Sequence, residues 1–269
     1  RVFEADAVIV AVSDMRGLYG HYALAPHPFS AALLSRLFDQ GISLVDCEFL
    51  SFDNHLVDLA LGGLCVNEEF MTPVDGLFAI GGSAAKCHGA SVLPGNALLF
   101  ELASALIATR HLPEYLGSHL QIQNAGSSKI FDHAVQVEKR RIVDYLEMTG
   151  PEMSFVLSEE LSTLMMDCLG PLKENRKILE GRMRIAELKN RFQRITVIDK
   201  GTWCNQSLAH ARTLEGLIHL ADVVAMAALQ RNESRGVHQK TELRERDDEH
   251  FGKHSKAVKS KEGVIINYE

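Results

Sequence analysis

Apolar residues in the first half of the chain occur in short runs that end at glycines or polar turns. Runs of roughly four to eight apolar residues predict buried strands, whereas a 3.6-residue period predicts helices. Strands are predicted over 5–12, 42–49, 56–66 and 76–82. Helices are predicted over 29–40, which Gly41 would end, and 96–111, which Asn96 would cap. The alternation of strands and helices indicates an α/β unit.

The apolar period changes beyond a polar stretch at 117–128 that contains glycine and serine. Helices are predicted over 131–149, 158–169, 175–192 and 205–230. The last has the clearest pattern, because its leucines and alanines recur at i, i+3 and i+4 and Asn205 stands at its N-cap. This pattern predicts a bundle of three or four helices. Three units are therefore expected: residues 1–120 as α/β, 121–230 as the helical bundle and 231–269 as a charged C-terminal arm ending in a strand-like segment, Val264–Tyr268.

The amino-acid composition excludes several classes of protein. Apolar residues make up 46% and charged residues 23%, which is typical of a globular protein and argues against disorder. The formal net charge of −7 disfavours a nucleic-acid partner, which usually meets a basic field. The five cysteines are scattered without a Cys-x-x-Cys pair, so no metal site is predicted. The longest apolar run, 97–108, is broken by Glu101 and is too short to cross a bilayer.

A long signature stands in the last fifth of the chain. Residues 232–248 read NESRGVHQKTELRERDD. This segment resembles the ESRGxHxRxDxPxRDD signature of the flavoprotein subunits of succinate dehydrogenase and fumarate reductase. The segments MMDCLGPLKEN, HFGKH and GVIINYE are similar to further C-terminal segments of that family. The chain is thus identified as a member of this family.

The first half resembles the family's second FAD-domain segment. LALGGL stands for the family's YTMGGI, and GLFAIGGSAAKCHGASVLPGNALLFE stands for GLYAxGExxxxxHGANRLGSNSLxE. Two parts of the family pattern have no counterpart in this sequence. They are the GxGxxG motif of the first Rossmann half and the capping domain between the strands that end in QFHP and begin in YTMGG. The resemblance therefore implies an α/β remnant of an FAD-binding domain, an all-α bundle of three to four helices and an extended C-terminal arm.

The residues that would bind a dicarboxylate substrate are replaced. The resemblance places Asp53 and Asp58 where the family has histidines, and Val92 where it has an arginine. Two acids would repel a dicarboxylate, and valine cannot clamp it. No catalytic residue is therefore predicted, and whether the chain is an enzyme stays open.

The resemblance also implies a weakened FAD site. Ser13 and Asp14 replace glycines, and Gly82 replaces a glutamate that binds the adenosine ribose. The retained cofactor-site positions are Gly81, His88, Asn96, Ala97, Leu98, Arg235 and His238. They would serve FAD only together with a partner chain. Core roles for His88, and arm-holding roles for Arg235 and His238, are the competing interpretation.

Two functions follow from the resemblance. One is a degenerate, non-catalytic subunit with a structural or assembly role in a complex II-like particle, alongside flavoprotein and iron–sulfur subunits. The other is the C-terminal half of a split FAD-dependent oxidoreductase that passes electrons to an iron–sulfur subunit. Either would meet a membrane only through its complex, on the matrix side of the mitochondrial inner membrane or the cytoplasmic face of a bacterial membrane. The first residue, Arg1, is expected of a processed chain, a fragment or an incomplete sequence.

Overall fold

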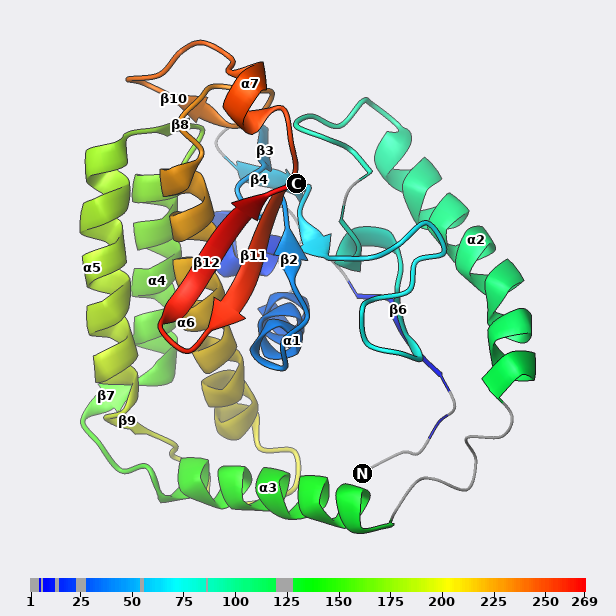
Figure 1. Ribbon diagram of the computed structural model, residues 1–269. Helices are drawn as coiled ribbons and strands as arrows, with labels where there is room; N and C mark the ends of the chain where they lie inside the picture. Colours follow the sequence, from blue (N-terminus) through cyan, green and yellow to red (C-terminus); the bar gives the residue numbers. More distant parts are fainter. Residues whose placement is uncertain are drawn as a thin grey trace.

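The computed structural model describes residues 5, 7–12, 15–22, 28–53, 56–85, 87–119 and 128–269. Figure 1 shows upright helices on one side, a β-hairpin crossing in front of them and a long helix, α2 (Asn96–His119), on the opposite side. A further helix, α3 (Ser128–Glu147), crosses the base. The mixed α/β architecture with several helices agrees with the predicted class.

The region predicted as a bundle, residues 121–230, contains four described helices. Their bounds are α3 Ser128–Glu147, α4 Ser154–Leu169, α5 Asn175–Phe192 and α6 Gln206–Gln230. Each lies within a few residues of its predicted range. Asn205 caps α6 as predicted, because its side-chain oxygen accepts a hydrogen bond from the Leu208 N–H at 2.8 Å. Short parallel strand pairs tie the ends of these helices together. They are β7 Glu152–Met153 with β9 Ile195–Thr196, and β8 Leu172–Lys173 with β10 Gln239–Lys240.

Helix α6 is the centre of the molecule. It packs on α4 and α5, and also on α1 (Pro28–Asp39) from the N-terminal unit. A Cβ at Gly216 would lie 3.0 Å from the Cα of Ala32, so glycine allows the close approach of α6 and α1. Among the described residues, α6 is the one helix long and apolar enough to span a membrane, but most of it is buried inside the fold. Such burial is the pattern of a core helix.

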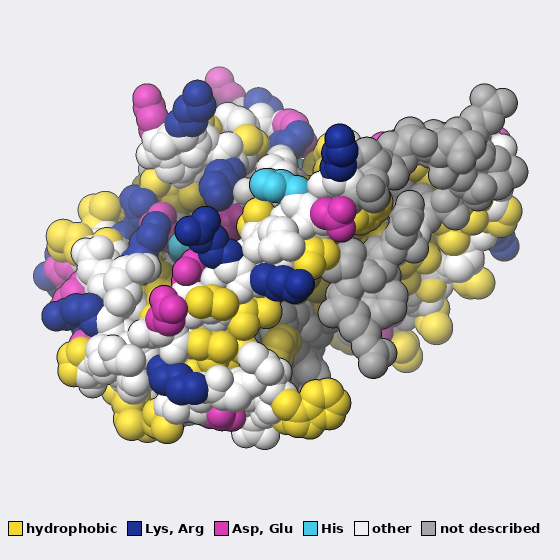
Figure 2. Space-filling model, turned by 90° about the horizontal axis from the view of Figure 1, so that it is seen from below, with side chains coloured by type: hydrophobic (Ala, Val, Ile, Leu, Met, Phe, Trp, Pro, Cys, Tyr) yellow, Lys and Arg dark blue, Asp and Glu magenta, His cyan; other side chains and the backbone are white. Residues whose placement is uncertain are grey.

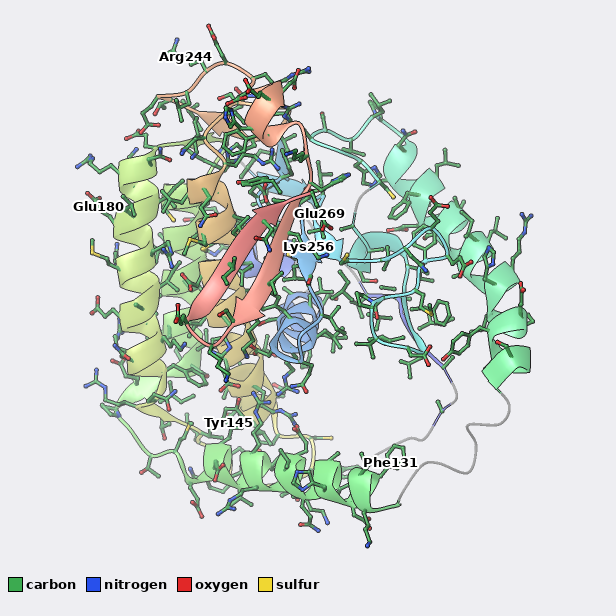
Figure 3. All side chains as sticks on the ribbon, viewed as in Figure 1. Phe131, Tyr145, Glu180, Arg244, Lys256 and Glu269 are labelled. Atoms are coloured by element: carbon green, nitrogen blue, oxygen red, sulfur yellow. The ribbon has the colours of Figure 1, made fainter. Side chains whose placement is uncertain are left out.

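The four-stranded sheet joins two strands of the N-terminal half to the C-terminal hairpin. Its strand order is β12–β11–β2–β5 and every pairing is antiparallel. The strands are β2 Leu44–Val45, β5 Gly63–Leu64, β11 Ser255–Ser260 and β12 Gly263–Tyr268. At the open end of the β11–β12 hairpin, Lys256 Nζ donates to Glu269 at 3.1 Å, and both are labelled in Figure 3. Because β11 pairs with β2, the arm packs back on the α/β unit.

The predicted strands of the first half are shorter than expected. The segment 42–49 forms only β2, and 76–82 forms β6 (Leu77–Ala79) followed by a 3₁₀ turn at Gly81–Ser83. The strand at 5–12 shortens to β1 (Val8–Val10), which pairs in parallel with β6 alone. The expectation that this strand is buried is wrong for Val8 and Ile9, which are exposed. With one neighbour among the described strands, β1 has little to cover it.

Two further predictions need correction. Helix α2 runs from Asn96 to His119, eight residues beyond its predicted end. Asn96 is its first helical residue rather than the cap before it. The predicted segment 56–66 breaks as its glycines suggested, into β4 (Leu56–Ala60) and β5. Strand β4 pairs with β3 (Leu50–Asp53), and only residues 54 and 55 connect the two. The predicted boundary at 120–121 lies outside the described residues.

Candidate functional site

The two best-preserved sequence motifs meet in space. The HG loop, residues 87–95, lies against the signature turn, residues 233–238. The Val237 N–H donates to the Ala90 carbonyl at 2.9 Å. Gly236 has φ +53°, and a Cβ there would lie 2.0 Å from the same carbonyl oxygen. Glycine is therefore required at this contact, because any side chain would collide with backbone.

Arg235 points into the C-terminal arm. Its guanidinium makes two hydrogen bonds to Glu233, at 2.7 and 2.9 Å, and a third to Asp248 at 2.7 Å. The hydrogen bonds from Arg235 to Glu233 are the main reason that the pKa of Arg235 is raised. The side chain thus fixes the start of the arm to the short helix α7 (Asp248–Phe251).

His238 is fully buried beneath the signature turn. Its Nε2 lies 3.2 Å from the Arg231 carbonyl, and its ring stands edge-on to Phe49 at 6.1 Å. Burial, and then the charges of Lys173 and Lys240, lower the pKa of His238 well below its usual value. The ring is therefore neutral, and its Nδ1 makes no hydrogen bond with any described residue.

Arg231 is the centre of a buried ion cluster, consisting of Arg231, Glu48 and Glu233, that sequence reasoning missed. All three side chains are fully buried. Arg231 donates to Glu48 at 2.6 Å and to Glu233 at 2.8 Å. It also donates to the carbonyls of Phe251 and Lys253, at 3.0 Å each. Burial disfavours its charge, but the two carboxylates outweigh burial and raise its pKa. No motif in the sequence marks this arginine, which merely follows an apolar helix.

Two buried lysines lie beside this cluster. Lys173 on β8 and Lys240 on β10 are register partners in a parallel pair. Lys240 Nζ donates to the Leu229 carbonyl at 3.0 Å and to Asn232 at 3.1 Å. Lys173 Nζ makes no hydrogen bond with any described residue. Burial is the main cause that lowers the pKa of each lysine to about 8.

The remaining predicted cofactor residues range from buried to exposed. Gly81 has φ +58°, and its N–H donates to Ser104 at 2.9 Å. His88 is half-buried and stands edge-on to Phe100 at 5.2 Å, and burial lowers its pKa. Asn96, Ala97 and Leu98 form the first turn of α2, and both Asn96 and Leu98 are exposed.

The substrate positions can be placed only in part. Asp53 ends β3 and Asp58 lies in β4, but their side chains lie outside the described part of the chain. Val92 is half-buried in the HG loop. Ser13 and Asp14 also lie outside the described residues. Across the described ranges, no group of three or more His, Cys, Asp or Glu side chains is arranged to hold a metal ion.

Comparison with known proteins identifies the family. Residues 158–269 match the family described as "Fumarate reductase flavoprotein C-term". The succinate dehydrogenase flavoprotein subunit of Bacillus subtilis is 33% identical over 195 residues, covering 72% of this chain and 33% of that protein. The fumarate reductase flavoprotein subunit of Haemophilus influenzae is 30% identical over 266 residues, covering 97% of this chain and 42% of that protein. The chain belongs to the succinate dehydrogenase/fumarate reductase flavoprotein family. It spans between a third and about two-fifths of the length of these relatives.

Solved structures agree with this assignment. FrdA of Escherichia coli quinol fumarate reductase superposes with a TM-score of 0.86 over 99% of this chain and 66% of that chain, at 18% identity. At that identity the likeness shows the fold alone. A quinol–fumarate reductase solved with menaquinol has a TM-score of 0.72 and 27% identity, over 80% of this chain and 37% of that one.

The described residues can be tested against a flavin of this flavoprotein family. The N-terminus of α2 lies among the predicted cofactor residues, where helix N–H groups favour an anion, and Gly89 and Gly95 leave open space beside it. However, Asn96 and Leu98 in this helix turn are exposed, His88 is only half-buried, and Arg235 and His238 are turned into the arm. The described residues form one wall and no enclosure, so by themselves they do not fit a cofactor of that size.

Proposed function

We propose that this chain is a non-catalytic, flavoprotein-subunit-like component with a structural role in a succinate dehydrogenase- or fumarate reductase-type assembly. One observation carries the proposal. The signature residues Arg235 and His238 are engaged within the arm, where they support the buried ion cluster rather than face an open pocket. Residues used in this way stabilise a scaffold whether or not a reaction takes place.

The replaced substrate positions support the same proposal. Asp53, Asp58 and Val92 stand where cationic side chains would be needed to hold a dicarboxylate. Two residues connect β3 to β4, so no capping domain can lie between these strands. A structural component requires neither dicarboxylate-binding cations nor a capping domain.

An exposed face on α2 offers a docking surface for such a role. Leu98, Leu102 and Leu106 recur at every fourth position and are 58–64% exposed, and Leu99 lies beside them. Figure 2 shows hydrophobic side chains along the side of the molecule on which Figure 1 places α2. An apolar stripe of this kind on a soluble surface is typical of a protein interface. The partners proposed for it are the flavoprotein and iron–sulfur subunits of the assembly, at the matrix side of the mitochondrial inner membrane or the cytoplasmic face of a bacterial one.

A second candidate is one half of a split FAD-dependent oxidoreductase that passes electrons to an iron–sulfur subunit. The open space beside Gly89 and Gly95, next to the exposed first turn of α2, favours it. A partner covering this edge would complete an enclosure that the described residues lack.

Purification from the native source distinguishes the two candidates. The particle that contains this chain is isolated through an affinity tag, and its native mass, its components and its flavin absorbance are measured. A structural component predicts a particle that holds an iron–sulfur subunit and a complete flavoprotein chain, whose flavin content is unchanged by Arg235→Lys. If the chain is half of a split enzyme, the particle should contain one other flavoprotein-like chain, which carries the GxGxxG motif. Arg235→Lys should then lower the amount of bound flavin. A monomer without partners would contradict both.

A further inference from the structure

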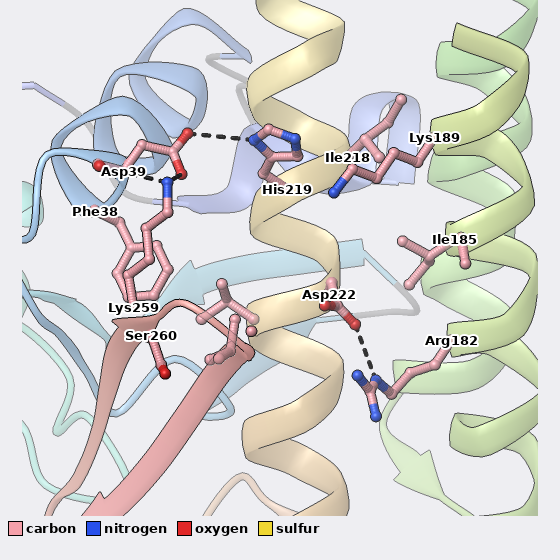
Figure 4. A pocket seen from close by; sticks show the side chains of 14 residues that line it. Phe38, Asp39, Arg182, Ile185, Lys189, Ile218, His219, Asp222, Lys259 and Ser260 are labelled. Carbon is pink, nitrogen blue, oxygen red and sulfur yellow. Dashed lines mark hydrogen bonds and ion pairs between the residues drawn. The ribbon is translucent and has the colours of Figure 1, made fainter. Parts of the chain in front are cut away.

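A cavity of about 340 Å³ opens between α5, α6, the end of α1 and the tip of the β11–β12 hairpin (Figure 4). None of its lining residues belongs to the HG loop or the signature turn. Apolar side chains from all four elements contribute to its walls: Phe38, Ile185, Ile218 and Val264. This volume is at the lower end of the range for small-molecule sites.

Two cationic side chains on one wall have hydrogen-bond donors without a partner among the described residues. Arg182 and Lys189 stand seven residues apart on α5, with Ile185 between them on the same face. Arg182 Nε donates to Asp222 at 2.9 Å, and no other hydrogen bond joins its guanidinium to a described residue. Lys189 has no ion pair with a described residue. Figure 4 shows Lys189 reaching from α5 toward His219 on α6.

The opposite wall carries a carboxylate, Asp39, that already accepts hydrogen bonds from two side chains. Asp39 is bound by His219 at 3.2 Å and by Lys259 at 2.6 Å. Burial opposes its ionisation, but the hydrogen bonds from His219 and Lys259 outweigh burial and lower the pKa of Asp39 to about 2. The carboxylate is therefore charged at neutral pH and has two donors of its own.

The charges around the cavity leave an excess of one positive charge. Three cations, Arg182, Lys189 and Lys259, face two carboxylates, Asp39 and Asp222. This excess is unusual in a chain whose formal net charge is −7. The free donors are those of Lys189 and the terminal nitrogens of Arg182, and both residues line the cavity together with Ile185 and Ile218.

We propose that this cavity binds a small organic anion with a compact apolar body, such as an aryl carboxylate. The apolar body packs on Ile185, Ile218 and Val264. The anionic group accepts hydrogen bonds from Lys189 and the free guanidinium nitrogens of Arg182, because charge-assisted hydrogen bonds are the strongest that such a group can gain. The proposal does not depend on the function proposed above, because the two sites share no residue.

The test uses 2-naphthoate and its neutral analogue 2-naphthamide as probes on the whole chain. Isoleucine methyl groups are labelled with ¹³C, and their NMR shifts are followed during titration. We expect saturable shifts at Ile185 and Ile218 with 2-naphthoate, and about fivefold weaker binding of 2-naphthamide because it lacks the charge. Equal affinity for both probes, the absence of saturation, or shifts at Ile130 or Ile198 instead would overturn the proposal.

Matched variants separate the site from a general charge effect. Lys189→Gln should weaken 2-naphthoate binding about fivefold and leave 2-naphthamide unaffected. The control is Lys177→Gln, at another exposed lysine of α5, which pairs with Glu174 at 2.9 Å and does not line the cavity. It should leave both affinities unchanged. Equal losses in the two variants would show a non-specific charge effect and overturn the assignment.

Discussion

At the scale of single residues, the buried ion cluster is the most consequential feature. Two carboxylates and one guanidinium are completely buried. Burying charges costs desolvation free energy unless every charge is paired. Arg231 meets this requirement with four oxygen partners and the ring of Phe49 at 4.8 Å. Among the described residues, Arg231 is the cation that pairs with both carboxylates.

Arg231→Met is expected to destabilise the chain by about 3–5 kcal/mol, because Glu48 and Glu233 would lose their shared buried partner. Glu233 would keep Arg235, whereas the Ser255 hydroxyl would be the one remaining donor to Glu48 among the described residues. Urea unfolding measures the loss. Arg246→Met is the control, since Arg246 makes an exposed pair with Asp248 and should cost less than about 1 kcal/mol. Similar losses in the two variants would contradict the role given to Arg231.

Gly236→Ala is expected to destabilise more than Gly89→Ala. Both glycines have φ near +55°, so alanine at either position bears the same backbone strain. Only at Gly236 would the new Cβ meet the Ala90 carbonyl, whereas nothing lies within 4 Å at Gly89. The difference between their free energies of unfolding measures the collision, and we expect at least about 1 kcal/mol. Equal losses of unfolding free energy would mean that the contact between Gly236 and Ala90 adjusts to the new Cβ without an energetic cost.

Lys173→Met is expected to stabilise the protein at pH 7. The native pKa of Lys173 is about 8 and its unfolded value is near 10.4, so the unfolded chain binds its proton more tightly. The resulting penalty is fully present below pH 8 and disappears as pH rises through about 10.4. The variant should gain up to about 3 kcal/mol at pH 7 and little at pH 10.5. Denaturant unfolding at both pH values checks this, with the exposed Lys139→Met as the charge control. A gain independent of pH would contradict the mechanism.

At the scale of elements, α2 and β1 share an unusual property. Both are predicted from apolar patterns, and both leave many of those apolar side chains exposed. Helix α2 exposes Leu98, Leu102 and Leu106, and β1 exposes Val8 and Ile9. Elements with such patterns are stabilised mainly by burial of the apolar face, so a covering surface is expected in the assembly proposed above.

If the chain belongs to the assembly proposed above, replacing Leu98, Leu102 and Leu106 together by glutamine is expected to release it from that assembly. Stability should change little, because glutamine has a helix propensity close to that of leucine and the three side chains are already exposed. Native mass of the tagged particle measures the effect. A variant with glutamine at the exposed positions Leu172, Met183 and Ile198 is the control, and it should stay assembled. If the α2 variant still yields intact particles, α2 is not part of the interface.

At the scale of the whole molecule, the C-terminal arm joins parts that are distant in sequence. Strand β11 pairs with β2, at Lys256 with Val45 and at Ala257 with Leu44. Asp46 accepts hydrogen bonds from the His254 ring at 2.6 Å and from the Ser255 N–H at 3.1 Å. The α/β unit and the arm are thus parts of one sheet, and α6 packs beneath both.

Deleting residues 233–269 is expected to lower Tm and solubility. The deletion exposes the edge of β2 and leaves Arg231 and Glu48 without the arm that covers them. Thermal unfolding and the soluble fraction after expression measure the outcome. An unchanged Tm would show that the arm contributes nothing to the fold.

Much of the helical architecture could be predicted from the sequence. Helices α1, α5 and α6 lie within two residues of their predicted bounds, because a long 3.6-residue period with a cap or a glycine stop is a local signal. The short strands were predicted less well, since two or three residues carry no detectable period. The signature also identified the family without any knowledge of contacts.

The positions of the candidate site residues could be named from the sequence, but their roles could not. Whether Arg235 faces a cofactor or the arm depends on Glu233 and Asp248, and only the folded chain brings Asp248 to it. The importance of Arg231 and Lys173 arises from burial by segments up to about 180 residues away, such as Glu48. The cavity beside Lys189 likewise requires four elements to converge. Local patterns determined the helices and the family, whereas long-range burial and pairing decided which charges are structural and which remain free to bind, because desolvation depends on neighbours that the local sequence does not specify.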